Sequence, residues 1–191
     1  MNVKYTKTIR SGIVPVSETY EIIVVGGGVA GCFAAATAAE QGADVVQLER
    51  KSAAEAGHIA CGDAMKAPTD PKKYAGPIDM RAIAADEDVR VDGNIDQIEW
   101  WDEEIDVKKI LPYEGHSNVV DRYEFGQRLL EQTAACGVDQ HFDTVVNGVL
   151  QGAQVEGVRA VRDGESVTYT AELVIDAGGS LSSVMADVDF A

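Results

Sequence analysis

The sequence has no long apolar run. In its 191 residues, no stretch approaches the roughly 20 apolar residues that a membrane-spanning helix needs. Residues 1–21 also lack the apolar core of a secretory signal peptide. These two absences predict a cytoplasmic protein. A peripheral location with transient contact to a membrane surface stays open.

Cysteine is scarce, and its spacing does not suit cross-linking. The chain has three cysteines, Cys32, Cys61 and Cys136, an odd number without a CxxC pair. This pattern favours reduced thiols over a disulfide framework or a zinc cage. Cys32 and Cys136 fall in helix patterns, where a small thiol usually fills space. The three histidines have no partner at metal-ligand spacing, so no metal site is expected.

Basic residues are also few relative to acidic ones. The chain has 16 basic and 32 acidic residues, a formal net charge of −16. Such a surface repels nucleic acid and anionic membranes, so we expect no nucleic-acid partner. The acidic runs 86–88 and 102–104 are interpreted as solvated faces rather than metal sites. An acid-rich surface that holds water and cations suggests a halophile.

The first part of the chain predicts a strand, a helix and a second strand. Residues 20–25 form a largely apolar run that ends in three glycines, which is typical of a buried parallel strand. Residues 29–41 are rich in alanine and stop at Gly42, as expected for a helix with a glycine cap. Residues 43–48 predict the next strand. Residues 51–76 hold glycines and prolines without a period, which indicates a long irregular segment of functional importance.

The rest of the chain alternates between strand and helix patterns. Asp121 with Glu124 resembles a capping box and marks the start of a helix. No repeat or linker divides the chain, so we predict an N-terminal extension over 1–19 and one α/β domain over 20–191. The further predictions are short strands of an inserted sheet over 89–111 with a turn at Asp92-Gly93, a helix over 121–136, a strand over 141–146, and a hairpin of 155–161 and 167–175 turned by Asp163-Gly164.

The glycines at the end of the first strand carry the clearest chemical signal. Residues 26–31 fit the pattern GxGxxG between a predicted strand and a predicted helix. In this pattern Gly26 allows the turn, Gly28 lets the backbone approach a pyrophosphate, and Gly31 lets the helix pack closely on the strand. The helix N-terminus then offers N–H donors and positive potential to the phosphates. A glycine-rich turn without a ligand is the alternative.

Glu49 stands at the tip of the second predicted strand, where dinucleotide-binding domains carry an acid. Its carboxylate can accept hydrogen bonds from both ribose hydroxyls and would repel a 2′-phosphate. FAD and NAD therefore fit this pattern, whereas NADP does not. Cys61 lies in the irregular segment after this strand, at the sheet edge that faces ligands, although an ordinary loop cysteine is an equal alternative.

The order of the motifs resembles the geranylgeranyl reductase family over about residues 20–184. These are FAD-dependent enzymes that saturate prenyl chains. The resemblance implies a Rossmann-like FAD-binding domain of the glutathione-reductase type, with a mixed sheet and a β-meander. It also implies that the chain is the N-terminal portion of this fold, truncated at the C-terminus. The motifs are Gly26 to Gly31, Glu49-Arg50, Cys61-Gly62-Asp63, Asp121-Arg122 at a helix start, and 176–179 after a strand.

The resemblance also assigns site residues. Cys61 is expected to be catalytic, near the flavin ring and the substrate. The residues expected to bind FAD are Gly26, Gly28, Ala30, Gly31, Glu49, Arg50, Cys61, Gly62, Ala64, the helix-opening Arg122, and Val146 through its backbone on the adenine side. The chain departs from the family pattern at Val29, Ala60, Asp63 and Ala64.

The function that the resemblance implies is reduction of isolated double bonds in the geranylgeranyl chains of archaeal membrane-lipid precursors. Reduced FAD supplies hydride, and an acid supplies the proton. The expected partners are a prenylated lipid substrate and an electron donor, either ferredoxin or NADPH. Two alternatives remain open: a flavin-dependent monooxygenase or halogenase, and an inactive FAD-binding fragment.

Overall fold

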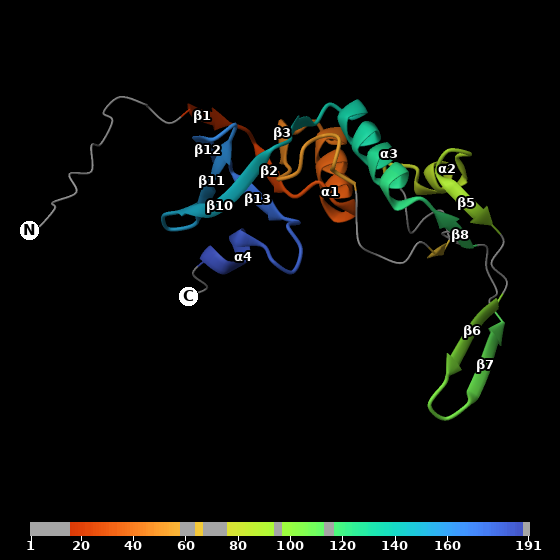
Figure 1. Cartoon of the computed structure of the whole chain (residues 1–191). Coiled ribbons are helices and arrows are strands. Elements are labelled where there is room, and N and C mark those ends of the chain that lie inside the picture. The colour runs from red at the N-terminus through yellow and green to blue at the C-terminus, as the bar shows by residue number, and fades with distance from the viewer. Residues whose placement is uncertain (1–15, 58–63, 67–75, 94–96, 113–116, 189–191) are drawn as a thin grey trace, which may run out of the picture.

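A four-stranded parallel sheet forms the centre of the fold. The computed structural model describes residues 16–57, 64–66, 76–93, 97–112 and 117–188 (Figure 1). The sheet has the order β13-β2-β3-β9, and all three pairings are parallel. Its strands are β2 (Ile22–Val25), β3 (Val45–Leu48), β9 (Asp139–His141) and β13 (Leu173–Asp176). The two inner strands, β2 and β3, are the strands predicted from their apolar runs.

One helix covers one face of this sheet, and a second helix packs against the first. They are α1 (Val29–Glu40) and α3 (Arg122–Ala135), and both confirm the predicted helices. Ala35 of α1 packs against Val24 and Val45 because its small side chain lets the helix lie close to the strands. The Asp121 carboxylate caps α3 by accepting the N–H groups of residues 123 and 124.

A second sheet covers the opposite face. Its order is β1-β12-β11-β10, with strands β1 (Val16–Thr19), β10 (Thr144–Gln151), β11 (Val155–Arg162) and β12 (Glu165–Thr170). Strands β10 to β12 form an antiparallel meander, and β1 joins it in parallel, so this sheet is mixed. The core between the two sheets holds Ile23, Leu48 and the fully buried Tyr169. The short helix α4 (Ser183–Asp187) packs on β10.

Two predicted strands prove to be pairs of strands in different sheets. The prediction of one strand over 141–146 is wrong, because Asp143 has φ 51° and turns the chain from β9 into β10. The run 167–175 likewise splits into β12 and β13. In both places residues typical of strands stand on either side of only one or two polar residues, so the sequence pattern does not reveal the crossing. The hairpin turn is confirmed, with Asp163 and Gly164 both at positive φ.

The inserted region between β3 and α3 is more elaborate than predicted. Short strands over 89–111 are confirmed, but Asp92-Gly93 is not a turn, because both residues pair with β8 as part of β5. The chain also forms α2, β4 and β8, which the sequence did not predict. The elements are β4 (Ala64–Lys66), α2 (Met80–Ala85), β5 (Arg90–Gly93), β6 (Gln97–Asp102), β7 (Val107–Pro112) and β8 (Ser117–Val120). The β6–β7 hairpin projects from the rest of the chain (Figure 1).

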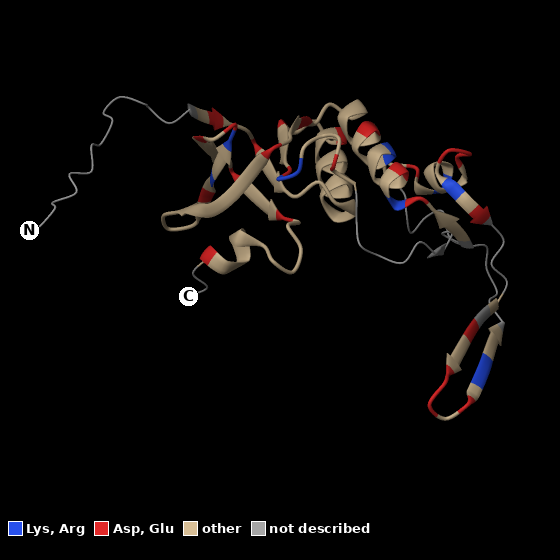
Figure 2. Cartoon of the chain, viewed as in Figure 1, with Lys and Arg blue, Asp and Glu red and all other residues tan. Residues whose placement is uncertain are grey.

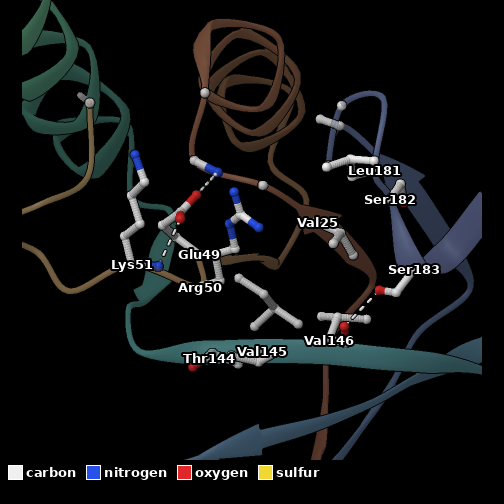
Figure 3. A pocket seen from close by; sticks show the side chains of 18 residues that line it. Val25, Glu49, Arg50, Lys51, Thr144, Val145, Val146, Leu181, Ser182 and Ser183 are labelled. Atoms are coloured by element: carbon white, nitrogen blue, oxygen red, sulfur yellow. Dashed lines mark hydrogen bonds between the residues drawn. The ribbon is translucent and has the colours of Figure 1, made fainter. Parts of the chain in front are cut away.

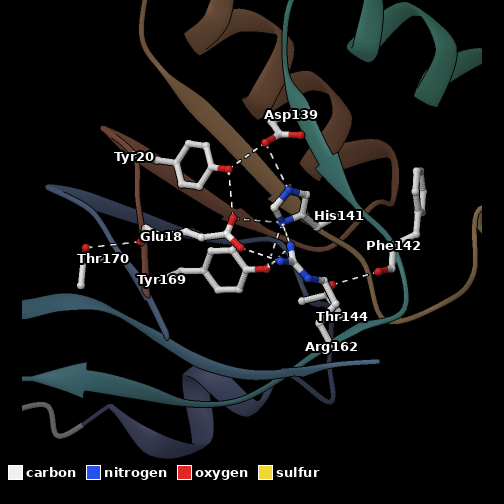
Figure 4. Close-up of polar contacts among 9 residues, drawn as sticks. All are labelled: Glu18, Tyr20, Asp139, His141, Phe142, Thr144, Arg162, Tyr169 and Thr170. Atoms are coloured by element: carbon white, nitrogen blue, oxygen red, sulfur yellow. Dashed lines mark hydrogen bonds and ion pairs between the residues drawn. The ribbon is translucent and has the colours of Figure 1, made fainter. Parts of the chain in front are cut away.

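A cluster of polar side chains joins the two large sheets at the edge strand β9 (Figure 4). The Arg162 guanidinium pairs with Glu18 of β1 and donates a hydrogen bond of 2.9 Å to the Tyr169 hydroxyl. His141, one of the three histidines for which we expected no metal site, lies 3.1 Å from Asp139 and 2.9 Å from the same hydroxyl. Burial raises the pKa of Tyr169 to about 12, so its hydroxyl stays neutral. The cluster therefore fixes β1 and β9 to the meander.

Acidic side chains are spread over the described surface (Figure 2). The runs 86–88 and 102–104 lie at the turns that follow α2 and β6 and are largely exposed, as expected for solvated faces. Arg128 is within 4.0 Å of Asp86 and 3.5 Å of Asp88. Within the described ranges, no group of three His, Cys, Asp or Glu residues could hold a metal ion, and no helix is long and apolar enough to cross a membrane.

The excess of acids predicts that folding stability depends on salt. Repulsion within a chain of net charge −16 is screened as the Debye length falls from about 10 Å at 0.1 M to about 3 Å at 1 M salt. We expect the thermal midpoint to rise over this range, and to rise less in the Glu103→Gln, Glu104→Gln double variant. A midpoint that stays constant from low to molar salt would rule out the halophile interpretation.

Candidate functional site

A cavity of about 540 Å³ opens at the carboxyl ends of the central strands (Figure 3). It lies where β2, β3 and β13 end and β10 passes beside them. This is the edge at which open parallel sheets bind their ligands. The residues that line it are Val25 to Gly28, Leu48 to Lys51, Gly57, Thr144 to Val146, Ala177 to Gly179, and Leu181 to Ser183.

The glycine turn between β2 and α1 forms the floor of the cavity. Gly26 has φ +112°, and a Cβ there would meet the backbone of Ala177. A Cβ on Gly31 would collide with the Gly26 carbonyl, so the helix can pack closely only because residue 31 is glycine. Gly28 differs, since a Cβ there would meet nothing within 4 Å. The protein itself leaves open the space beside Gly28 that a close ligand needs.

The N-terminus of α1 has no acceptor from its own side chains. Its first residue follows Gly28, no side chain caps it, and its first turn holds no acid. In contrast, α2, α3 and α4 are capped by Asp79, Asp121 and Ser182. Ala30 is exposed in this first turn and carries no bulky side chain. The helix therefore presents N–H groups and positive potential to an anion at the cavity.

Glu49 is held in a fixed orientation beside the glycine turn. Its Oε2 accepts the Gly27 N–H at 2.6 Å, and its Oε1 accepts the Lys51 N–H at 2.8 Å. Its own N–H donates to the His141 carbonyl, and its carbonyl accepts the Thr144 N–H, both at 2.9 Å. Each carboxylate oxygen keeps a lone pair for a further donor, as the predicted contact with ribose hydroxyls requires.

Two cations follow Glu49 at the cavity. Arg50 is exposed, and Figure 3 shows its guanidinium in front of the glycine turn. Lys51 lines the same cavity. In a chain with 32 acids, two adjacent cations at one cavity favour a negatively charged ligand.

The loop after β13 closes the far side of the cavity. The Asp176 Oδ1 accepts the Gly178 N–H at 3.0 Å and the Ser182 hydroxyl at 2.8 Å, which folds the loop back on itself. Gly179 has φ +79°, which a residue with a side chain rarely adopts. The sequence identified this Gly-Gly pair only as part of a family motif and did not assign it to the site.

Other lining residues were also missed, and except for Lys51 they approach the cavity from other parts of the sequence. They are Lys51, Gly57, Thr144, Val145 and the segment 181–183. None has a local pattern that marks it. Thr144 and Val145 reach the site only because the chain turns at Asp143.

Of the two residues expected to contact the cofactor from β10 and α3, only Val146 lines the cavity. Val146 lines it, and its carbonyl accepts the Ser183 hydroxyl at 2.6 Å. Arg122 opens α3 and is not among the lining residues. It lies one helical turn before Gly126, whose backbone packs against Gly57 at the cavity. The cofactor contacts expected from both residues stay predictions.

The expected catalytic segment falls largely outside the described residues. Cys61 and Gly62 belong to 58–63, which the structure does not describe. Ala64 begins β4, which pairs with β8. The roles expected for these three residues therefore stay predictions.

Comparison with known proteins identifies relatives over most of the chain. The family described as FAD dependent oxidoreductase matches residues 21–189. Digeranylgeranylglycerophospholipid reductase of Methanocella arvoryzae is 29% identical over 174 residues, which cover 86% of this chain and 40% of the relative. The enzyme of the same name from Methanosarcina acetivorans is 30% identical over 174 residues, covering 87% and 39%. The chain thus spans about two fifths of these relatives.

Solved structures similar to this chain include a reductase-like protein and an FAD-dependent halogenase. A geranylgeranyl bacteriochlorophyll reductase-like protein from Thermoplasma acidophilum superposes with a TM-score of 0.69 at 26% identity, covering 84% of this chain and 39% of that one. The myxobacterial chondrochloren halogenase, an FAD-dependent halogenase, has a TM-score of 0.71 at 22% identity, covering 87% and 39%. The halogenase shares the fold. The expected resemblance to geranylgeranyl reductases is confirmed, and FAD is supported as the cofactor.

The residues at the cavity fit the adenosine and pyrophosphate part of FAD. The space at Gly28 and the uncapped α1 N-terminus suit a pyrophosphate, and the fixed Glu49 carboxylate suits a ribose. The chain thus supplies one donor set for the phosphates and one acceptor for the sugar.

Glu49→Ala should weaken FAD binding by roughly tenfold or more. Each ribose hydrogen bond to a charged acceptor contributes about 1.5 to 3 kcal/mol, and about 1.4 kcal/mol is a factor of ten. Glu49→Arg should bind FAD more weakly still, because it removes the acceptor and adds bulk. Flavin fluorescence titration measures both, with the exposed Glu165→Ala as the control. Equal affinity of wild type and Glu49→Ala would exclude the ribose contact of Glu49.

Proposed function

Because the chain belongs to the FAD dependent oxidoreductase family, we propose that it is the FAD-binding part of a reductase of isolated double bonds in geranylgeranyl chains. The substrates would be archaeal membrane-lipid precursors. The observation that carries this proposal is the 29–30% identity to digeranylgeranylglycerophospholipid reductases over 86–87% of the chain. The substrate, the prenylated lipid, and the electron donor, ferredoxin or NADPH, belong to the proposal.

The described residues hold and orient the cofactor in this scheme. The α1 N-terminus and the glycine turn hold the pyrophosphate, Glu49 holds the ribose, and Arg50 adds positive charge near the phosphates. Bound FAD supplies hydride chemistry that side chains lack. In this scheme the described part of the chain thereby fixes the adenosine and pyrophosphate end of the cofactor.

The halogenase or monooxygenase alternative rests on one observation. The chondrochloren halogenase superposes with a TM-score of 0.71, slightly above the reductase-like structure. Its sequence identity of 22% is lower, and the fold is shared by enzymes of several chemistries. We therefore place the reductase first.

The reaction is tested by supplying the lipid substrate directly. The FAD-loaded chain, alone and fused to the remaining C-terminal part of the Methanocella arvoryzae reductase, is incubated with digeranylgeranylglycerophospholipid and dithionite. Mass spectrometry should show one added H₂ for each reduced double bond. A parallel incubation with NADPH, O₂, halide and an aromatic substrate replaces the lipid and dithionite. An FAD-loaded fusion that leaves the lipid unsaturated but hydroxylates or halogenates the aromatic substrate there would favour the alternative instead.

Cys61 is the proposed catalytic residue of this chain, shaping the substrate site or assisting protonation. In the active fusion, Cys61→Ser should lower turnover by about tenfold or more, since loss of a proton-transfer group typically costs at least that factor. FAD affinity is titrated in the same variant, so that a loss of cofactor is separated from a loss of turnover. Cys136→Ser, at the C-terminal end of α3, is the matched control and should keep full turnover. Turnover of Cys61→Ser equal to that of the control would remove the assignment.

A further inference from the structure

A buried glutamine lies directly beneath the glycine turn. Gln47 of β3 is only 1% exposed, although its neighbours Val45, Val46 and Leu48 are apolar. A buried amide costs free energy unless its polar atoms are hydrogen-bonded. Gln47 Nε2 lies 3.2 Å from the Gly26 carbonyl and 3.7 Å from Cys32 Sγ, and Gln47 Oε1 lies 2.8 Å from Gln140 Nε2. The buried amide therefore links edge strand β9 to the turn.

The surroundings allow only one orientation of the Gln47 amide. The Gly26 carbonyl can only accept a hydrogen bond, so the Gln47 NH₂ group must face it. On the other side, Gln140 Nε2 donates to Gln47 Oε1 and lies 3.3 Å from the Leu130 carbonyl, which is also an acceptor. Each amide therefore donates toward the turn: Gln140 of β9 donates to Gln47 of β3, and Gln47 donates to the Gly26 carbonyl.

This contact sets the direction of the Gly27 N–H. In a trans peptide the C=O and N–H point to opposite sides. Because Gln47 holds the Gly26 carbonyl on the core side, the Gly27 N–H of the same peptide is turned away from Gln47. There it meets Glu49 Oε2 at 2.6 Å.

The next peptide is held in the same way through Cys32. Its thiol donates to the Gly27 carbonyl at 3.6 Å, while its sulfur accepts from Gln47. Burial raises the pKa of Cys32, which keeps the thiol protonated as a donor. With its carbonyl turned toward Cys32, this peptide directs the Gly28 N–H to the opposite side. We had expected Cys32 only to fill space.

We propose that Gln47 is a positioning residue for FAD: it holds the Gly26 carbonyl and, through Cys32, the Gly27 carbonyl. The Gly27 N–H then fixes Glu49, and the Gly28 N–H is left for the pyrophosphate. Gln140 is the residue that orients Gln47. This inference rests on FAD as the cofactor, and it makes the ligand-binding turn depend on side chains that never touch the ligand.

The first test replaces the amide without changing its length. Gln47→Met removes the donor but keeps a long buried side chain, and it should raise the Kd for FAD by roughly tenfold or more. The ¹⁵N resonances of Gly27 and Gly28 in the FAD-free chain should shift. Val158→Ala, in the core away from the cavity, is the control for lost stability and should change the Kd by no more than roughly twofold. A Gln47→Met chain with wild-type affinity and unchanged glycine resonances overturns the proposal.

The second test asks whether residue 32 acts as a hydrogen-bond donor or only fills space. It tests the proposal even if Gln47→Met does not fold. Cys32→Ser keeps a donor for the Gly27 carbonyl and should retain FAD affinity, whereas Cys32→Ala should lose it. Equal affinity of both variants overturns the role of the carbonyl contacts. If the wild-type chain binds no FAD, the cofactor assignment fails, and the glycine resonances of the FAD-free variants still decide whether Gln47 orients the turn.

Discussion

The hydrogen bond from the Gly27 N–H to the Glu49 carboxylate, 2.6 Å long, is the contact on which the site depends. It ties the turn after β2 to the end of β3, so that the residues that fit a pyrophosphate and the carboxylate that fits a ribose form one hydrogen-bonded unit. The unit requires glycine at 26 and 31, because a Cβ at either position would meet backbone. It also requires the crossing from β9 to β10, because His141 and Thr144 hold the Glu49 backbone from both sides.

Parts of the fold with a strong local signal could be predicted from the sequence. The apolar strand before the glycines, the alanine-rich helix and the Asp121 cap each depend on neighbours in sequence, and each was found. The crossings at Asp143 and after Thr170 could not be found, because only one or two polar residues separate the strand patterns on either side. The missed lining residues, such as Ser183, reach the cavity through the order of the strands, which no local pattern encodes.

Gln47 combines both cases within a single strand: its strand has a local sequence signal, but its role depends on neighbours from other elements. The strand itself was predicted correctly from its apolar residues, and a glutamine in that run was not interpreted. Its role becomes visible only when β9 and α1 supply Gln140 and Cys32 as neighbours. The cofactor assignment thus rests on geometry and the family together, whereas the proposed substrate rests on identity to named reductases.

The central claim is that the cavity at the glycine turn holds FAD, and amide NMR of the chain during titration with FAD tests it most directly. The account predicts that the largest shifts fall on the amides of Gly26 to Gly31, Lys51 and the Gly178-Gly179 pair, which surround the cavity. It predicts small shifts for the meander turn at Asp163-Gly164. Titration with ADP should shift the glycine-turn amides in the same direction. Absence of shifts at the glycine turn, or shifts confined to other surfaces, would contradict the account.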